Sequence, residues 1–175
     1  MSLFSKNLVR SSDSKGFTLI ELLVVVAIIG ILSSIVLASL NNARKKGRDA
    51  RRIADVKQLQ LALELYYDAN PSTGYPTALG TTASSALVSG GFISTIPNDP
   101  ANNAVYSYAA LGTGTACTSY HLGASLEVAG TVASQGDADA AVGTECTGSA
   151  TDFSGADAAA CAVGDTGVTC YDVKP

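Results

Sequence analysis

The sequence has 175 residues, with 11 basic and 15 acidic side chains and a formal net charge of −4. It holds a single histidine and shows no Ser–His–Asp set, metal-binding triad or phosphate-binding loop, so we expect no enzyme activity. The length suits one membrane helix and one soluble domain of about 100 residues.

A long apolar segment follows a short polar leader. From Phe17 to Leu40 there are 24 residues, of which only Glu21 is charged. A helix of this length measures roughly 36 Å, enough to cross a hydrocarbon core of about 30 Å. Because a charge is costly in such an apolar zone, we expect a cation from another chain to offset the Glu21 carboxylate.

The leader joins this span through the sequence KGFTLIE, residues 15–21. This junction, with the apolar run behind it, resembles the type IV pilin and pseudopilin family. In that family a prepilin peptidase cuts after the glycine, on the cytoplasmic face, and methylates the new amino terminus. The resemblance implies cleavage between Gly16 and Phe17, N-methylation of Phe17, and a Glu21 that accepts the amino-terminal charge of a neighbouring subunit.

Two other interpretations of the span fit less well. An ordinary secretory signal has a shorter apolar core and a small-residue cleavage site at its far end. A plain membrane anchor needs neither Glu21 nor a Gly-Phe junction.

Basic residues cluster just beyond the span. Residues 44–57 hold seven basic and two acidic side chains, whereas the leader holds three basic ones. By the positive-inside rule alone, the C-terminal part would stay in the cytoplasm. The resemblance to a peptidase site and the cysteines instead place that part outside the cytoplasmic membrane before assembly, and in an extracellular or cell-surface filament afterwards. The basic cluster would then meet lipid phosphates, acidic patches of neighbouring subunits, or solvent.

The helix is expected to continue to about Ala69, because Asn70-Pro71 is a natural stop. Apolar residues recur beyond the span at spacings of three or four: Ile53, Val56, Leu59, Leu63 and Tyr66. The chain then divides into a leader (1–16), a transmembrane or filament-core half-helix (17–40), an amphipathic half-helix (41–70) and a globular head (71–175).

The head is expected to complete an α+β fold, with the long helix packed on a small antiparallel sheet. Residues 83–88 predict a short helix. Alternating residues predict strands over 105–110 and 120–126, joined by a Gly-rich loop at 111–118, and a last strand over 168–173.

Four cysteines lie in the last third of the chain: Cys117, Cys146, Cys161 and Cys170. An even number in a small exported domain indicates two disulfides, and the spacing does not fit a zinc site. Three pairings are open. The short loop favours Cys161 with Cys170, which leaves Cys117 with Cys146; four reduced thiols are the alternative.

Candidate metal ligands are few. Residues 129–167 are rich in alanine, glycine and aspartate, and Asp137, Asp139 and Asp152 are candidate calcium ligands. Type II secretion pseudopilins often use a calcium in this region, yet no EF-hand is present, and a solvated acidic loop clamped by disulfides is the alternative. No other cofactor is expected. The histidine, His121, lies on the predicted second strand, where a surface or structural role is expected rather than that of a ligand.

The resemblance implies a structural subunit of a type IV pilus or pilus-like filament. Copies of the chain would assemble by helix bundling, with Glu21 pairing with a neighbour's Phe17 amine. Its partners would be the prepilin peptidase, membrane lipid before assembly, and the pilus or secretion machinery. Residues 58–175 hold one basic against 11 acidic side chains, which argues against direct nucleic-acid binding.

Two alternatives to the pilus remain open at this point. One is a type II secretion pseudopilin that drives protein export, supported by the similarity of Ile96-Pro97-Asn98-Asp99-Pro100 to the major pseudopilins of that system. The other, of a different class, is a monomeric membrane-anchored binding module. A DNA-uptake filament is a third possibility; it would need the basic residues 44–52 exposed, and we expect them to be covered. The sequence leaves open the choice between major and minor subunit, the adhesion target, retraction and glycosylation.

Overall fold

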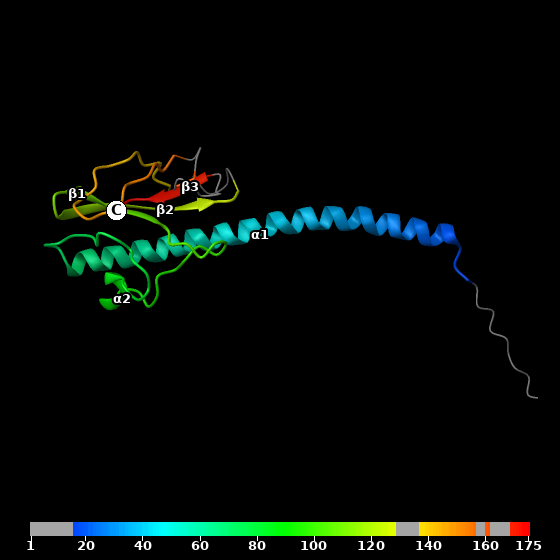
Figure 1. The fold of residues 1–175 in the computed structure, drawn as a ribbon, viewed down its shortest axis with the longest axis horizontal. Coiled ribbons are helices and arrows are strands. Elements are labelled where there is room, and N and C mark those ends of the chain that lie inside the picture. Colours follow the sequence, from blue (N-terminus) through cyan, green and yellow to red (C-terminus); the bar gives the residue numbers. More distant parts are fainter. Residues whose placement is uncertain (1–15, 129–136, 157–159, 162–168) are drawn as a thin grey trace, which may run out of the picture. The chain divides into compact units, whose positions relative to one another are not determined.

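The computed structural model describes residues 16–128, 137–156, 160–161 and 169–175. The predicted α+β class is confirmed: the elements are α1 (Leu19–Ala69), α2 (Ala86–Ser89), β1 (Ser107–Thr113), β2 (Ala116–Leu126) and β3 (Thr169–Val173) (Figure 1). The strands form one antiparallel sheet in the order β1-β2-β3. The chain divides into two compact units at the bond between Asn41 and Asn42, and each is described by itself.

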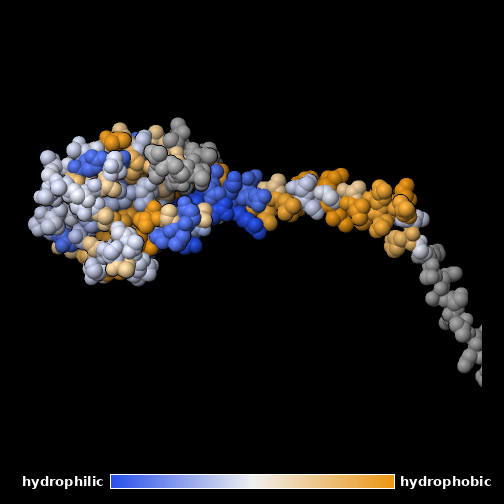
Figure 2. Space-filling model, viewed as in Figure 1, coloured by the Kyte–Doolittle hydropathy of each residue, from blue (hydrophilic) through white to orange (hydrophobic). Residues whose placement is uncertain are grey.

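The first unit carries the apolar part of α1. Its large hydrophobic side chains are exposed throughout; Leu19 is 81% exposed and Ile35 63%. Figure 2 shows this part of the helix as an almost continuous apolar surface. Within the described residues, α1 is the helix long and apolar enough to cross a membrane, by length and composition. The helix runs without a break through Gly30, where the sequence has its weakest helix former.

The second unit is organised around the other half of α1. Val56, Leu59 and Leu63 are fully buried there, as the apolar stripe predicts. They pack against one face of the sheet, to which β2 contributes alternate residues: Tyr120, Leu122, Ala124 and Leu126. Burying a leucine of this kind contributes about 1.5–3 kcal/mol. The core therefore fixes α1 to the sheet along the stripe.

The segment between α1 and the sheet is held by a short helix and buried aliphatic side chains. The predicted helix over 83–88 is shifted: α2 begins at Ala86 because the Ser85 hydroxyl caps it, accepting a hydrogen bond from the Leu87 N–H at 3.2 Å. Leu87, Ile93 and Ile96 are buried in the core. This segment thus packs as part of the domain rather than as a free linker.

The hairpin is tighter than the sequence indicates, and the predicted loop over 111–118 is wrong for most of its length. β1 and β2 pair as far as Thr113 and Ala116, so only Gly114 and Thr115 form the turn, with Gly114 at φ 62°. The glycines that indicated a loop have other roles. Gly112 lies at an irregularity in the strand register after Leu111, and Gly114 takes the positive φ of the turn.

The described residues 137–156 and 160–161, here called the covering segment, cover the other face of the sheet. It also pairs with both sheet edges. The Cys146 N–H donates to the Ala110 carbonyl beside β1, and the Ala138 N–H donates to the Asp172 carbonyl beside β3. Gly123 on β2 has no room for a side chain, because a Cβ there would lie 2.8 Å from the Phe153 ring. The sheet is therefore buried on both faces, and its outer edges are partly closed.

Two disulfides attach this covering segment to the sheet. Cys117 on β2 pairs with Cys146, and Cys161 pairs with Cys170 on β3, which is the pairing that the sequence analysis favours. The loops they close have sequence separations of 29 and 9 residues. In the chain-entropy account, such cross-links stabilise a fold by roughly 3–4 and 2–3 kcal/mol respectively.

A buried histidine reinforces the same layer. The His121 ring contacts the Asp152 carboxylate through Nδ1 at 2.7 Å and the Asp172 carboxylate through Nε2 at 2.8 Å, and it stacks on Phe153. All three polar side chains are fully buried. Both ring nitrogens of His121 are thus engaged by buried carboxyl groups. His121 therefore joins β2, β3 and the covering segment through polar contacts.

The predicted calcium site receives no support from this geometry. The Asp152 carboxylate accepts hydrogen bonds from His121 and the Gly143 N–H, and Asp137 accepts one from the Asp172 N–H. Within the described residues, no group of three or more His, Cys, Asp or Glu side chains is placed to hold a metal ion. The backbone of Asp139 has a positive φ of 44°, which is uncommon for a residue other than glycine.

A cluster of ion pairs fixes the second unit's part of α1 to the end of β2. The buried Arg52 guanidinium contacts Asp49, Asp99 and Glu127 at 2.5–2.9 Å. Arg48 forms a two-bond pair with Glu127 at 2.6 and 2.7 Å. Hydrogen bonds from Arg48, and then from Arg52, lower the pKa of Glu127 to about 2. Each guanidinium thus joins residues far apart in the sequence.

Acid should weaken this cluster. The folded pKa of Glu127 lies below its usual value of 4.5, so its contribution is complete above pH 4.5 and is lost as the pH falls towards 2. We expect the free energy of unfolding to fall by about 1–2 kcal/mol over that range, since solvent screens this partly exposed group. Urea unfolding of the full chain in detergent, followed by tyrosine near-UV circular dichroism, measures this. Glu127→Gln should flatten the acid limb, and an unchanged limb would contradict the assignment.

Removing the His121 ring should be costly. His121→Ala leaves the buried Asp152 and Asp172 carboxyl groups without their shared partner, and a buried polar group left unsatisfied costs about 1–3 kcal/mol. The matched control is Thr118→Ala, which alters an exposed side chain on the same strand and should change stability by less than about 0.5 kcal/mol. The same urea unfolding measures both variants. Equal losses would show that His121 has no special role.

Candidate processing and assembly site at the start of α1

The backbone around the predicted cleavage bond is open. Gly16 and Phe17 precede Leu19, the first residue of α1. No heavy atom lies within 4 Å of the position that a Cβ would take at Gly16, and Phe17 is 89% exposed. A peptidase needs accessible backbone, and the residues on both sides of this bond are exposed. Residues 1–15 lie outside the described residues, so the leader stays a prediction.

The first turn of α1 is closed by a capping box. The Oε2 atom of Glu21 accepts hydrogen bonds from the Thr18 N–H at 2.8 Å and from the Thr18 hydroxyl at 2.6 Å. In return, the Glu21 N–H donates to Thr18 Oγ1 at 3.3 Å. This is the reciprocal arrangement that the pattern Thr-x-x-Glu forms at helix starts. Thr18 and Glu21 thus satisfy N–H groups that the helix start would otherwise leave without partners.

Sequence reasoning missed this second role of Glu21. The expectation was that only a cation from another chain could offset the carboxylate, yet one of its oxygens is satisfied within the chain. The spacing of Thr18 and Glu21 was the signal that could have identified the box. In the described part of the chain, Oε1 is left without a hydrogen-bond partner. Glu21 can therefore cap its own helix and still present an oxygen to a cation.

The other predicted site residues lie in the second unit. The four cysteines form its two disulfides. Asp137 and Asp152 bind groups of the head, as described above. The processing and assembly candidates are therefore only Gly16, Phe17 and Glu21, with Thr18 added by the structure.

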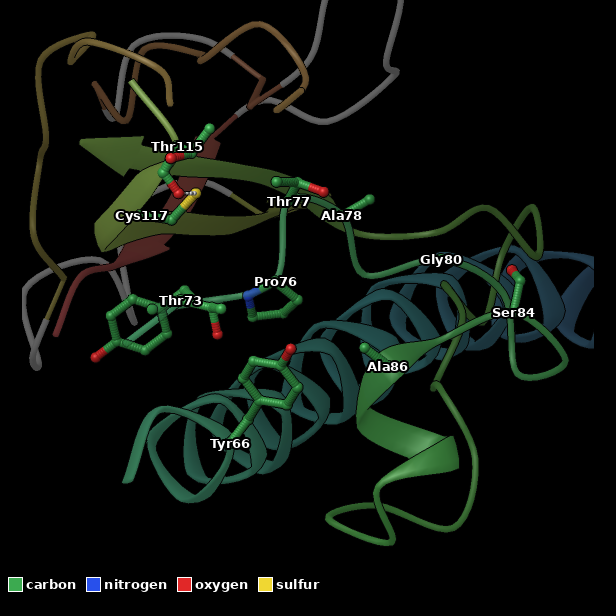
Figure 3. A pocket seen from close by; sticks show the side chains of 12 residues that line it. Tyr66, Thr73, Pro76, Thr77, Ala78, Gly80, Ser84, Ala86, Thr115 and Cys117 are labelled. Atoms are coloured by element: carbon green, nitrogen blue, oxygen red, sulfur yellow. Dashed lines mark hydrogen bonds between the residues drawn. The ribbon is translucent and has the colours of Figure 1, made fainter. Parts of the chain in front are cut away.

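The head also has a hollow of about 490 Å³ (Figure 3). Tyr66 of α1, the Thr73–Ala86 stretch and Cys117 of β2 line it. Its polar groups are hydroxyls and backbone, and no acidic, basic or histidine side chain is among the lining residues. The lining residues therefore offer hydroxyls but no acidic, basic or histidine side chain to activate them.

The start of the chain matches a known sequence motif. Residues 11–37 match the prokaryotic N-terminal methylation motif. Type II secretion system core protein G of Aeromonas hydrophila is 34% identical over 101 residues, which is 50% of this chain and 68% of that protein. The chain belongs to this pilin-like family. No solved structure matches the chain at a comparable level.

Two further relatives show the breadth of the family. Core protein G of Vibrio cholerae is 35% identical over 100 residues, covering 50% of this chain and 66% of that protein. The type IV major fimbrial protein FimA of Dichelobacter nodosus is 43% identical over 71 residues, covering 36% of this pilin-like chain and 44% of FimA. The matches thus include both a secretion protein and a fimbrial protein.

The capping box of this pilin-like chain can be tested apart from any assembly. Thr18→Ala removes the acceptor of the Glu21 N–H, so we expect that amide to exchange about fivefold faster, the usual effect of losing an N-cap side chain. Glu21→Gln keeps an oxygen for the Thr18 N–H and should leave exchange at Thr18 and Glu21 within about twofold. Amide hydrogen exchange of the full chain in detergent micelles measures both. Equal acceleration in both variants would refute the box.

Proposed function

We propose that the chain is the structural subunit of a pilus-like filament. One observation carries the proposal: the first half of α1 exposes a long apolar surface that only lipid or further copies of the chain can cover. A soluble monomer would leave this surface in water. The exposed Gly16–Phe17 bond and the methylation motif support the same conclusion.

The proposed sequence of events begins in the cytoplasmic membrane. The apolar half-helix spans the bilayer as a single pass, and the head lies on the outer side. A prepilin peptidase removes residues 1–16 and methylates Phe17. The new amine carries a positive charge, which a neighbouring subunit's Glu21 accepts through Oε1. In the filament, the apolar half-helices bundle and replace lipid as each other's cover. Extraction needs a separate motor and assembly machinery.

Two kinds of filament fit the comparisons: a type II secretion pseudopilus and a type IV pilus. Most of the similar proteins named above are secretion core proteins, and their matches extend over about 100 residues, whereas the match to the fimbrial protein covers 71. The longer matches favour a type II secretion pseudopilus. A type IV pilus is the second candidate, favoured by the higher identity to FimA over the shorter stretch. In both, the role is structural rather than catalytic.

Mass spectrometry of the protein purified from its own membranes and filaments tests the proposal. We expect a mature chain that begins at Phe17, carries one added methyl group at its amino terminus and retains two disulfides. The Gly16→Val variant should keep residues 1–16, because the residue before the cut is no longer small. A chain recovered only as a monomer with its leader attached would overturn the proposal.

Two variants separate the assembly role of Glu21 from its capping role. Glu21→Gln should abolish filament recovery while leader removal continues, because the charge is lost and the cap kept. Thr18→Ala keeps the charge and should still give filaments. Equal filament yields from Glu21→Gln and the parent would refute the assembly role of the Glu21 charge, and the absence of filaments from both would favour a monomeric anchored module. Long surface fibres would indicate a pilus, and loss of secretion in a deletion strain would indicate a pseudopilus.

A further inference from the structure

Three consecutive basic side chains at the beginning of the second unit have no partner. Arg44, Lys45 and Lys46 are exposed, and in the described part of the chain none contacts an acid. The other bases nearby differ. Arg48 pairs with Glu127 and Arg52 is buried among three carboxylates. Of the seven bases between residues 44 and 57, these three adjacent ones therefore remain available as a group, here called the collar.

The collar faces many directions around the helix. Successive residues of an α-helix are rotated by about 100°, so three in a row point over roughly 200° of its circumference. A protein partner docks on one side of a helix and would favour bases spaced three or four apart. Bases that point over more than half of the circumference fit a partner that surrounds the helix.

The distance from the apolar span fits the same partner. Leu40 is the last large apolar residue of the span, and Arg44 to Lys46 follow by four to six residues within α1. At about 1.5 Å per residue the collar lies roughly 6–9 Å further along the helix axis. The polar headgroup layer on each side of a bilayer is about 5–8 Å thick. Figure 2 shows a strongly hydrophilic band on the helix after the apolar stretch.

The acids of the head are poor partners for this collar. Although the head is acidic, most of its carboxylates already bind groups within it. Glu64 accepts hydrogen bonds from two tyrosines, and Asp55 from Tyr106. The carboxylates that bind arginines, histidine or backbone are Asp49, Asp99, Glu127, Asp137, Glu145, Asp152 and Asp172. Among the described acids of the second unit, only Asp68 and Asp139 have no such contact. The described acids of a second copy are therefore mostly engaged in contacts within their own fold.

We propose that Arg44, Lys45 and Lys46 bind the phosphate groups of anionic phospholipids in the leaflet next to the head. The inference rests on the membrane-anchored stage of the proposed function, but not on filament assembly. Clustered bases next to a membrane helix attract anionic headgroups, and both Arg and Lys bind phosphate. The collar sets the depth of the subunit in the membrane before extraction, and its lipid contacts must break when the subunit leaves.

The test measures binding of phosphatidylglycerol to the full chain. Native mass spectrometry of the protein in detergent, titrated with phosphatidylglycerol or with phosphatidylcholine, gives apparent affinities for both lipids. The parent should prefer phosphatidylglycerol, and the preference should fall with added salt. The variant with Arg44→Gln, Lys45→Gln and Lys46→Gln should bind phosphatidylglycerol at least about tenfold more weakly, with phosphatidylcholine binding unchanged.

A charge-matched control keeps the net charge of that variant but spares the collar. It carries Arg51→Gln, Lys57→Gln and Lys174→Gln and should bind phosphatidylglycerol as the parent does. Near-UV circular dichroism checks that all three proteins have the same fold. Parent-like binding by the collar variant, or equal loss in both variants, would overturn the proposal. Cross-links from Lys45 or Lys46 to acids of a second copy, without a lipid preference, would do so too.

Failure of the collar proposal can be distinguished from failure of the proposed function with the same proteins. Leader removal and filament recovery are scored in parallel in cells. If leader removal and filament formation persist but the lipid preference is missing, only the collar proposal fails. If the lipid preference is present but the leader stays attached and no filament forms, the proposed function fails and the collar proposal stands.

Discussion

The apolar surface on the first half of α1 is the constraint on which the rest of the molecule depends. A helix that shows leucine, isoleucine and valine on every side cannot remain in water, and the described residues of its own unit offer nothing to cover it. Before assembly lipid must cover it, and in a filament other copies must. The second half of the same helix has only one apolar stripe, and that stripe is already buried in the head. One continuous helix thus combines a segment that needs other molecules with a segment complete in itself.

The head needs its cross-links because its sheet is thin. Three strands with many small residues cannot bury a large core, and one face of the sheet is covered by a segment without regular secondary structure. Two disulfides and the His121 cluster attach that segment. The Cys161–Cys170 disulfide and the His121 cluster lie on the outer face, whereas the Cys117–Cys146 disulfide is part of the hydrophobic core on the helix side. The outer face is therefore held mainly by a disulfide and polar contacts, and the helix side mainly by burial.

The sequence was most informative where one periodic pattern decided the structure. The span, the stripe containing Val56 and Leu59, and the alternation along β2 all appear as expected. The Gly-rich stretch around Gly112 was misassigned, because glycine marks a bulge and a tight turn as readily as a loop. The His121 cluster could not be predicted, since its two carboxylates are 31 and 51 residues away in the sequence. Capping at Thr18 was predictable, and was missed because the charge of Glu21 suggested only an intermolecular partner.

The structure also changes how the charges of the chain should be interpreted. By count the head is acidic, and the residues after the span are basic, which suggests two complementary surfaces. In the folded protein, however, most of the described carboxylates of the second unit contact arginine, histidine, tyrosine or backbone groups, so few of them are free of contacts within that unit. The basic side chains that follow the span fall into two groups. Arg48 and Arg52 join the head, while the three preceding bases stay outside it. The free charge near the membrane is therefore positive, and an external anion is the partner that it lacks.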